Sequence, residues 1–430
     1  MTEEITAVDD LQAGIRETKG KVFLLIGSYL PGFKGGGPTR STSNLVSALG
    51  KEFAFKVVTL DRDHRATSPY PDIPANQWVK TGNADVMYLR PGWGGLVKMI
   101  QLLRSVEQSS LLYLNSFFSR RFSMLPVFLK RLGLIHPGCL VLAPRGEFSP
   151  GALQIKSRRK KLHIMLSRWL GLYRGTIWHA SSQLEAADIQ RWFGGTGVIS
   201  IAAVIPKPIE SNRSLTQSPL HHTQSLASLP HANGSAQRLK TSGHLRIVFV
   251  SRISPKKNLL NALRMLKGII GDVFFDIYGP LEDVEYWSAC ERVIGTLPPN
   301  IRVRYCGEVE HDRVLDLFAM YDLFLFPTLG ENYGHVICEA LAAGCPVLIS
   351  DRTPWRGLSD AGAGWDIPLD DVQEFRRALQ SCIDADHEMY EELRVGAREY
   401  VRKYVANPEI ISANRRLFQE AAAIARAPAR

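Results

Sequence analysis

The segment 321–350 alternates between strand-like and helix-like patterns, and it constrains the fold more than any other part of the chain. Residues Tyr321–Phe326 form a short apolar run that is typical of a buried strand. After a polar loop, a helical pattern begins at His335 and ends before Gly344, and residues 346–350 form a second strand-like run. This order places a helix N-terminus at the carboxyl edge of a parallel sheet. Open α/β sheets bind ligands at that edge, and the unpaired N–H groups of a helix end attract anions.

Two glutamates frame this predicted helix start. Glu331 lies in the loop, and Glu339 lies about one turn into the helix. Because carboxylates repel phosphate, they are suited to accept hydrogen bonds from sugar hydroxyls on either side of a diphosphate. One such carboxylate alone would more often be a solvated surface residue. The pair beside a helix start favours a ligand site.

The same segment resembles the E-x7-E signature of retaining glycosyltransferases with the GT-B fold, family 4 in particular. The matching residues are Pro327, Glu331, Gly334, Glu339, Ala340, Gly344 and Pro346. The resemblance implies that Glu331 holds hydroxyls of the donor sugar and that Glu339 holds the ribose of the nucleotide. The other expected donor-binding residues are Asn332, Tyr333 and Gly334, beside the sugar, and His335 and Val336, at the helix start.

Two basic residues follow the strand pattern that opens the second half of the chain. After Leu245–Val250 comes SRISPKKN, in which Arg252 and Lys257 are spaced to reach phosphate from beside the sheet. This string is similar to the family 4 pattern whose Arg and Lys contact the donor diphosphate. We therefore expect Arg252, Lys257 and Glu331 to be the catalytic residues.

Strand and helix patterns alternate along both halves of the chain, which predicts an α/β fold. We expect two doubly wound Rossmann-like domains that face each other across a cleft, the GT-B arrangement implied by the resemblance. The predicted parts are an acceptor-binding domain at 1–209, a flexible linker or insertion at 210–244, a nucleotide-sugar domain at 245–405 and a C-terminal helix at 406–430. In many GT-B proteins the last helix crosses back to the first domain.

The first domain has two candidate sites of its own. Gly36 and Gly37 follow the first strand pattern and allow close approach of backbone to a ligand, although a plain turn explains them equally well. Arg145 and Glu147 follow a later buried strand and are candidates for the acceptor side. Many family 4 members have a His-Gly pair at a comparable strand end. This chain has Arg-Gly, which puts a His-based role in doubt.

The positive charge of the chain is concentrated in the first domain. Through Glu210 there are 27 Lys and Arg against 15 Asp and Glu, whereas the rest of the chain has 25 against 27. Residues 155–175 combine a basic run with apolar residues and Trp169, a pattern typical of an interfacial helix on anionic lipid. A helix that packs its apolar residues on its own domain is the alternative. No nucleic-acid-binding motif accompanies the charge, so we expect no nucleic-acid partner.

The sequence has no signal of a metal site or of secretion. There is no Asp-x-Asp motif, and the six cysteines lack ligand spacing, so no metal is expected. The N-terminal residues are acidic and polar, and no apolar run reaches about 18 residues. We expect a cytoplasmic protein, peripheral at the inner face of the plasma membrane.

These features together predict a retaining glycosyltransferase. It would move a hexose-type sugar from a UDP- or GDP-sugar, with no cofactor required, to a saccharide or lipid-linked acceptor hydroxyl. Assembly of bacterial polysaccharide or envelope is the expected setting. The alternatives are a GT-B nucleotide-sugar epimerase or phosphorylase, or a non-catalytic basic scaffold that binds membranes.

Overall fold

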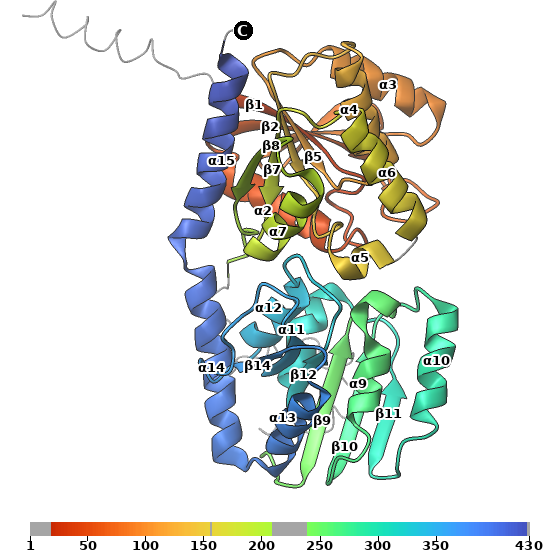
Figure 1. Cartoon of the computed structure of the whole chain (residues 1–430), viewed down its shortest axis with the longest axis vertical. Helices are drawn as coiled ribbons and strands as arrows, with labels where there is room; N and C mark the ends of the chain where they lie inside the picture. The colour runs from red at the N-terminus through yellow and green to blue at the C-terminus, as the bar shows by residue number, and fades with distance from the viewer. Residues whose placement is uncertain (1–18, 155–156, 209–238, 428–430) are drawn as a thin grey trace, which may run out of the picture. The chain divides into compact units, whose positions relative to one another are not determined.

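The computed structural model describes residues 19–154, 157–208 and 239–427, which form two compact units (Figure 1). The first unit contains the chain up to Phe148, the segment that ends at Ile205, and the part from Glu409 onward. The second unit contains residues 149–155 and Pro206–Pro408. Residues 1–18 of the predicted first domain lie outside the described residues. So does most of the linker predicted at 210–244, but residues 239–244 are described and a strand already begins at His244.

The first unit is built on an eight-stranded sheet with the order β3-β4-β2-β1-β5-β6-β7-β8. The strands are β1 (Gly20–Leu25), β2 (Phe53–Leu60), β3 (Trp78–Thr81), β4 (Ala84–Leu89), β5 (Leu111–Asn115), β6 (Cys139–Ala143), β7 (Thr176–Ala180) and β8 (Gly197–Ile201). All pairs are parallel except β3 with β4. The sequence patterns did not predict the edge strands β3 and β8, because both are short and largely exposed.

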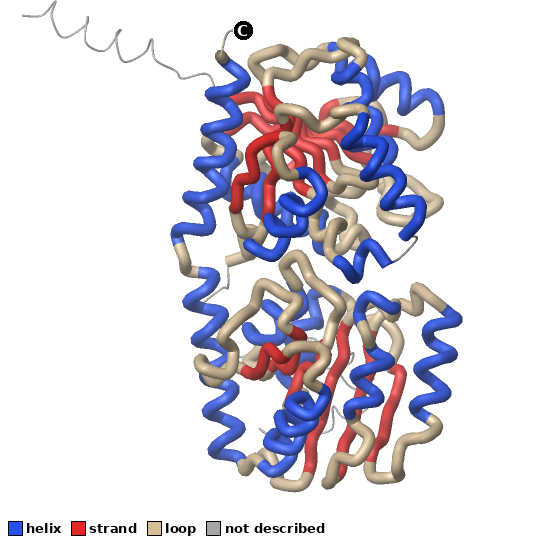
Figure 2. The backbone as a smooth tube through the Cα atoms, in the orientation of Figure 1, coloured by secondary structure: helices blue, strands red, loops and turns tan. Residues whose placement is uncertain are grey.

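Helices cover the faces of this sheet (Figure 2). They are α2 (Gly37–Leu49), α3 (Trp93–Arg104), α4 (Leu125–Arg131), α6 (Ser157–Trp169) and α7 (Gln183–Phe193), with a π-helical turn at Arg120–Met124 and the short α5 (Pro150–Gln154) assigned to the second unit. Aromatic rings fill the core beside β5 and β7, where Phe117 lies 4.9 Å from Tyr173 and Trp178 lies 4.8 Å from Phe193, centroid to centroid. Strands β5, β6 and β7 are buried on both faces, as expected of the middle of a parallel sheet.

The second unit contains a fully parallel six-stranded sheet with the order β11-β10-β9-β12-β13-β14. Its strands are β9 (His244–Val250), β10 (Asp272–Tyr278), β11 (Ile301–Tyr305), β12 (Leu323–Phe326), β13 (Val347–Ser350) and β14 (Gly364–Ile367). Its helices are α9 (Leu259–Met265), α10 (Val284–Ile294), α11 (Val314–Ala319), α12 (His335–Ala342), α13 (Val372–Asp384) and α14 (His387–Val405), with 3-10 turns at Pro255–Lys257 and His311–Arg313. The α/β class with two Rossmann-like units is thereby confirmed.

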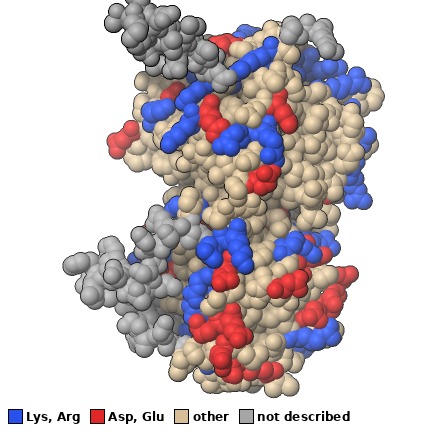
Figure 3. All heavy atoms as spheres, turned by 90° about the vertical axis from the view of Figure 1, so that its left-hand side faces the viewer, with Lys and Arg blue, Asp and Glu red and all other residues tan. Residues whose placement is uncertain are grey.

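The last helix, α15 (Pro408–Arg426), packs on the first unit from Glu409 onward. The amide of Asn414 donates to the carbonyl oxygen of Ala203 over 2.8 Å. Phe418 is fully buried, and its ring stacks on that of Tyr113 with a centroid distance of 5.6 Å. Arg415 forms a bidentate ion pair with Glu52. Figure 3 shows the side of the molecule that carries α15, where basic and acidic side chains are mixed.

Candidate active site

The order of strands in the second sheet reverses between β9 and β12. From β9 the chain continues outward to β10 and β11, and it then returns to the other side of β9 to build β12, β13 and β14. From β9 and from β12 the chain therefore continues to opposite sides of this point in the sheet. Such a switch point is where open α/β sheets bind ligands. Lys257 ends the turn after β9, and Glu331 lies in the loop after β12.

Lys257 and Glu331 form a close ion pair at this switch point. The Nζ of Lys257 donates to Oε1 of Glu331 over 2.6 Å, and each side chain is only 12% exposed. The hydroxyl of Thr328 donates to the same oxygen over 3.1 Å. The Lys257 ammonium also lies 5.4 Å from the ring centroid of Phe326. The structure thus brings together two of the three predicted catalytic residues.

Glu331 stays ionised in this environment. Burial alone would raise the pKa of the carboxyl group, but the charges of Lys257 and Lys256 and the hydrogen bonds from Lys257 and Thr328 outweigh it. The pKa of Glu331 is therefore lowered from its ordinary value of 4.5. An ionised carboxylate with one oxygen engaged by Lys257 and Thr328 is suited to accept a hydrogen bond from a sugar hydroxyl.

Hydrogen bonds to main-chain carbonyl oxygens join the two loops that carry the pair. The carbonyl oxygen of Lys256 accepts from the backbone N–H of Leu329 over 2.9 Å and lies 3.2 Å from the hydroxyl oxygen of Thr328. The buried amide of Asn258 donates to the carbonyl oxygen of Pro327 over 2.7 Å. These bonds fix the position of Lys257 relative to Glu331. The two residues are therefore held together by the backbone of their loops as well as by their own ion pair.

The turn after β13 holds the loop from its other side. The carbonyl oxygen of Arg352 accepts from the N–H of Glu331 over 3.0 Å, and the indole N–H of Trp355 donates to the carbonyl oxygen of Tyr333 over 2.5 Å. Trp355 is 1% exposed. Sequence reasoning did not identify Trp355 as a support of the site. Tyr333, an expected donor-binding residue, is 4% exposed and packs its ring against Trp355 and His335.

Helix α12 begins directly after this loop. Its N-cap is Gly334, with φ 78°, and no side chain of the described chain caps the helix there. A Cβ at Gly334 would lie 2.8 Å from the side chain of Ile337, so glycine suits both the backbone angle and the space. The helix begins at His335, where the sequence predicted its start, so the N–H groups of His335 and Val336 belong to its first turn. Asn332 lies half-buried in the loop before them.

Glu339 and Arg252 have other partners than the Lys257–Glu331 pair. An oxygen of Glu339 lies 3.8 Å from Nδ1 of His311, and the Glu339 side chain is 19% exposed. Arg252 follows β9 as predicted, but its guanidinium is 54% exposed and binds both oxygens of Glu282 over 3.0 Å. The roles expected for Glu339 and Arg252 therefore stay predictions.

In the first unit, Gly36 and Gly37 form the start of α2. Gly36 is its N-cap with φ 68°, no side chain in the described chain caps it, and Gly37 opens the helix. Asp63 orders the preceding loop, because its Oδ2 accepts from the N–H groups of Phe33 and Lys34 over 2.9 and 3.0 Å. Sequence analysis missed Asp63, whose only signal was its place just after a strand.

Arg145 follows β6 and is held by neutral groups. Its Nε donates to Oδ1 of Asn115 over 2.8 Å, and its Nη2 donates to the hydroxyl of Tyr113 over 2.9 Å. That hydroxyl lies 2.8 Å from Nδ1 of the buried His179, whose Nε2 faces the carbonyl oxygen of Ala202. Burial, followed by the charge of Arg145, lowers the pKa of His179 to about 3, so the imidazole is neutral.

Glu147, the second residue expected on the acceptor side, supports a loop. Its Oε1 accepts from the hydroxyl of Ser116 over 2.7 Å, and its Oε2 accepts from the N–H groups of Phe117 and Phe118. Burial raises the pKa of Glu147 even though these hydrogen bonds oppose the shift. Both oxygens of Glu147 therefore have protein partners. Arg145, by contrast, uses its Nε and Nη2 for the bonds to Asn115 and Tyr113.

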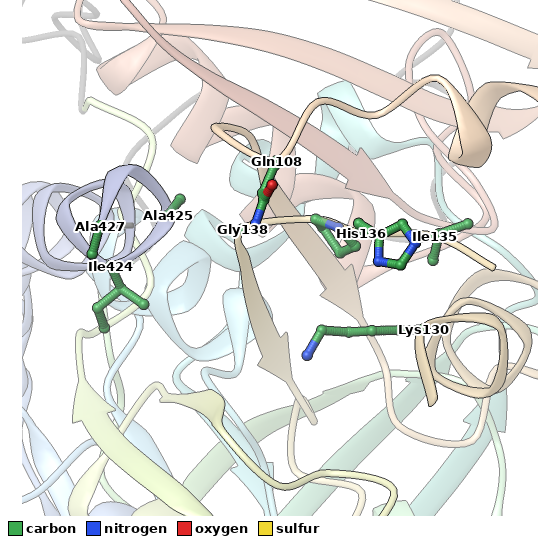
Figure 4. A pocket seen from close by; sticks show the side chains of 9 residues that line it. Gln108, Lys130, Ile135, His136, Gly138, Ile424, Ala425 and Ala427 are labelled. Carbon is green, nitrogen blue, oxygen red and sulfur yellow. The ribbon is translucent and has the colours of Figure 1, made fainter. Parts of the chain in front are cut away.

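A separate pocket of about 370 Å³ lies in the first unit, away from these loops. Figure 4 shows Lys130, Ile135 and His136 near it, together with Ile424, Ala425 and Ala427 at the end of α15. Its lining residue Gly138 directly precedes β6, so the pocket is at the amino edge of the sheet, opposite the edge where such sheets bind ligands.

Two general features of the described residues bear on function. They contain no group of three or more His, Cys, Asp or Glu placed to hold a metal ion. Among the helices of the described chain, none is both long and apolar enough to cross a membrane.

Residues 233–403 match the family model described as "Glycosyl transferases group 1". The chain is 30% identical over 251 residues to the phosphatidyl-myo-inositol mannosyltransferase of Mycolicibacterium smegmatis, which covers 56% of this chain and 58% of that protein. It is 25% identical over 245 residues to the protein of the same name from Mycobacterium leprae, with coverages of 55% and 59%. The chain thus aligns with less than two thirds of the length of these relatives.

Solved structures share the whole two-unit fold. Sucrose-phosphate synthase from Thermosynechococcus elongatus superposes with a TM-score of 0.65 at 16% identity, covering 94% of this chain and 99% of the other. Anabaena Alr3699/HepE in complex with UDP-glucose gives the same score, identity and coverages. WaaG, a glycosyltransferase involved in lipopolysaccharide biosynthesis, gives 0.57 at 16% identity, with coverages of 95% and 100%. These likenesses show the GT-B fold.

Proposed function

We propose that this protein, whose second unit carries a glycosyl transferases group 1 domain, is a retaining glycosyltransferase of family 4 type that uses a nucleotide sugar. The observation that carries the proposal is the buried Lys257–Glu331 pair at the switch point of the second sheet, beside the N-terminus of α12. Relatives named mannosyltransferases and a structural neighbour that binds UDP-glucose support the reaction class and a UDP- or GDP-sugar donor.

The donor would lie against the loops that follow β9 and β12. Lys257 and the N–H groups at the start of α12 would bind the diphosphate and stabilise the charge that develops as it leaves. Arg252 is exposed enough to exchange Glu282 for a phosphate oxygen. The ionised Glu331 would accept a hydroxyl of the donor sugar, and Glu339 would accept from the ribose.

In the transfer step, the bond between the anomeric carbon and the diphosphate oxygen breaks, and the acceptor hydroxyl oxygen bonds to that carbon. Retention of configuration means that the acceptor approaches from the face that the diphosphate leaves. The departing phosphate oxygen can then take the hydroxyl proton, so no metal is needed to balance the step. Charge stabilisation by Lys257 and α12 is then the main contribution of the second unit.

We place the acceptor at the inner face of the plasma membrane, as a saccharide or lipid-linked hydroxyl. The relatives' names specify phosphatidyl-myo-inositol, a lipid, as the group on which they act. Arg145 is the acceptor-side residue of the first unit, because neutral partners hold its guanidinium at the carboxyl edge of the sheet. Residues 155–175 would contact an anionic membrane surface, and assembly of bacterial polysaccharide or envelope is the proposed setting.

Turnover of variants tests this function directly. Release of nucleoside diphosphate from UDP- and GDP-sugars is measured with a bacterial lipid extract as acceptor. Loss of one transition-state donor lowers kcat about 100- to 1,000-fold, and we expect a loss of this size for Lys257→Ala. Glu331→Gln removes the charged acceptor proposed for the donor sugar and should also lower turnover. Arg304→Ala, which breaks the Arg304–Asp276 pair elsewhere in the same unit, is the control and should retain turnover. Wild-type turnover by a folded Lys257→Ala protein would contradict the proposal.

A further inference from the structure

Helix α6 carries four of its five large apolar side chains on the side that faces solvent. Leu162, Met165, Leu166 and Trp169 are 57%, 62%, 47% and 82% exposed. They recur at intervals of three and four residues, so they form one stripe along the helix. Leu170, just beyond the helix, is 47% exposed and extends the stripe. A surface helix of a globular protein normally has the opposite arrangement, with polar residues outward.

The other side of α6 already packs against the first unit. Ile164 and Ser167 are 0% and 1% exposed. The ring of His163 lies 5.4 Å from that of Phe117, and the ammonium of Lys160 lies 5.3 Å from the ring of Phe118. The helix therefore has its core contacts on one side and the apolar stripe on the opposite side. Of the apolar residues of α6, Ile164 thus packs on its own domain, whereas Leu162 and Trp169 do not.

Positive charge flanks this stripe. Arg158, Arg159, Lys161 and Arg168 are all exposed on α6. Between Glu147 and Glu185 the chain contains no Asp or Glu at all. The side drawn in Figure 3, by contrast, mixes both signs of charge. An apolar stripe flanked by unbalanced cations complements an anionic lipid surface, in which the apolar side chains reach the acyl boundary and the cations meet phosphate.

We infer that the outward side of α6 docks this protein on an anionic lipid bilayer, with Leu162, Met165, Leu166 and Trp169 entering the interface. This inference rests on the proposed function only in taking the acceptor to be membrane-borne. A second copy of the chain fits less well, because two such helices would bring their cations together. Docking through α6 would hold the first unit, with Arg145, at the surface where a lipid-linked acceptor is found.

Sedimentation with vesicles tests the docking surface on the full chain without any nucleotide sugar. Wild-type protein should bind vesicles of phosphatidylcholine and phosphatidylglycerol and should not bind pure phosphatidylcholine. Trp169→Ala should weaken binding by about tenfold or more, since an aromatic side chain leaves the interface. Replacement of Arg158, Arg159 and Lys161 by Gln should weaken it by about 100-fold, and added salt should weaken wild-type binding similarly.

Matched substitutions in the second unit serve as controls. Ile270 is 79% exposed, so Ile270→Ala removes an exposed apolar side chain elsewhere. Replacement of Lys267, Arg402 and Lys403 by Gln removes three exposed cations from the second unit. Neither control should change vesicle binding by more than about twofold, a difference of roughly 0.4 kcal/mol. Lys257→Ala should bind vesicles like wild type, which separates lipid docking from nucleotide-sugar chemistry.

Three results would overturn the inference. The first is wild-type protein that does not bind the anionic vesicles. The second is binding that Trp169→Ala and the α6 charge variant leave unchanged. The third is a dimer that Trp169→Ala dissociates while no lipid is bound, because the stripe would then be a contact between copies. In each case the nucleotide-sugar site in the second unit would stand on its own test.

Discussion

At the scale of single residues, the Lys257–Glu331 pair contributes both to the stability of the fold and to the proposed function. Both side chains are nearly buried and 2.6 Å apart, so removal of one partner leaves the other charge buried and unpaired. Such a loss typically destabilises a protein by about 3–5 kcal/mol, whereas removal of both charges costs much less. A donor diphosphate that binds Lys257 would replace part of this pairing. The site is therefore held by the same charges that would handle the substrate.

The pH dependence of stability reports on Glu331 directly. Because the pKa of Glu331 is lowered from 4.5 in the folded protein, the ionised carboxylate stabilises the fold above that pH, and this stability is lost as pH falls through the folded-state pKa. We expect the difference in free energy of unfolding between wild type and Glu331→Gln to be full at neutral pH and to shrink below pH 4.5. Urea denaturation at a series of pH values measures it. A difference that grows as the solution becomes more acidic would contradict the assignment.

Sequence reasoning found Lys257 and Glu331 but could not foresee that they touch. Their contact depends on β9 and β12 being neighbours, which is a property of sheet order and not of either local pattern. The ring of Tyr333 lies in the core, a direction that the motif does not give. The donor contact expected from main chain around Asn332–Gly334 stays a prediction. Asp63 was missed because one aspartate after a strand has no distinguishing pattern.

At the scale of elements, the turn after β13 clamps the loop that carries Glu331. In Trp355→Phe a smaller aromatic ring replaces the indole, and the N–H that binds the carbonyl oxygen of Tyr333 is lost. A buried carbonyl left without a partner costs about 1–3 kcal/mol, and the loop should loosen accordingly. We expect the Kd for the nucleotide sugar to rise about tenfold. Calorimetric titration of the variant against wild type measures the change.

Trp287→Phe is the matched control for this substitution. Trp287 lies on α10 of the same unit and packs on Tyr305 with a ring distance of 5.0 Å, and its indole N–H has no hydrogen bond among the described residues. The Kd for donor should be unchanged in this variant. Equal weakening in both variants would mean that general packing, and not the bond to Tyr333, sets donor affinity.

Most elements were predictable from apolar runs, and those that were missed share a physical cause. The buried strands of both sheets have the uninterrupted apolar pattern that parallel sheets require. Edge strands β3, β8 and β14 do not, because one side of each faces solvent or a loop. Strand β14 also begins at Gly364, where a Cβ would overlap the carbonyl oxygen of Val347. Glycine is needed at this position because β13 and β14 approach each other closely there. In a sequence, however, a glycine is normally a sign of a turn.

At the scale of the whole molecule, the two units have different chemical roles in this account. The first carries the basic surface, the outward stripe of α6 and the fixed guanidinium of Arg145. The second carries the proposed nucleotide-sugar site at the switch point of its sheet. Helix α15 completes the core of the first unit through Phe418, although it is the last element in the sequence. The pattern of this helix predicted its existence, whereas its packing partners, Phe53 and Tyr113, became visible only in the fold.

The central claim is that the second unit binds a nucleotide diphosphate sugar through Lys257. Isothermal titration of UDP-, GDP- and ADP-sugars into the full chain tests it most directly, with Lys257→Ala and the Arg304→Ala control measured alongside. The account predicts that wild type and Arg304→Ala bind one of these nucleotide classes with the same affinity, and that Lys257→Ala loses at least about 1.5 kcal/mol of binding, the lower end for a charge-assisted hydrogen bond. Failure of all three nucleotide sugars to bind wild type, or equal binding by Lys257→Ala, would contradict it.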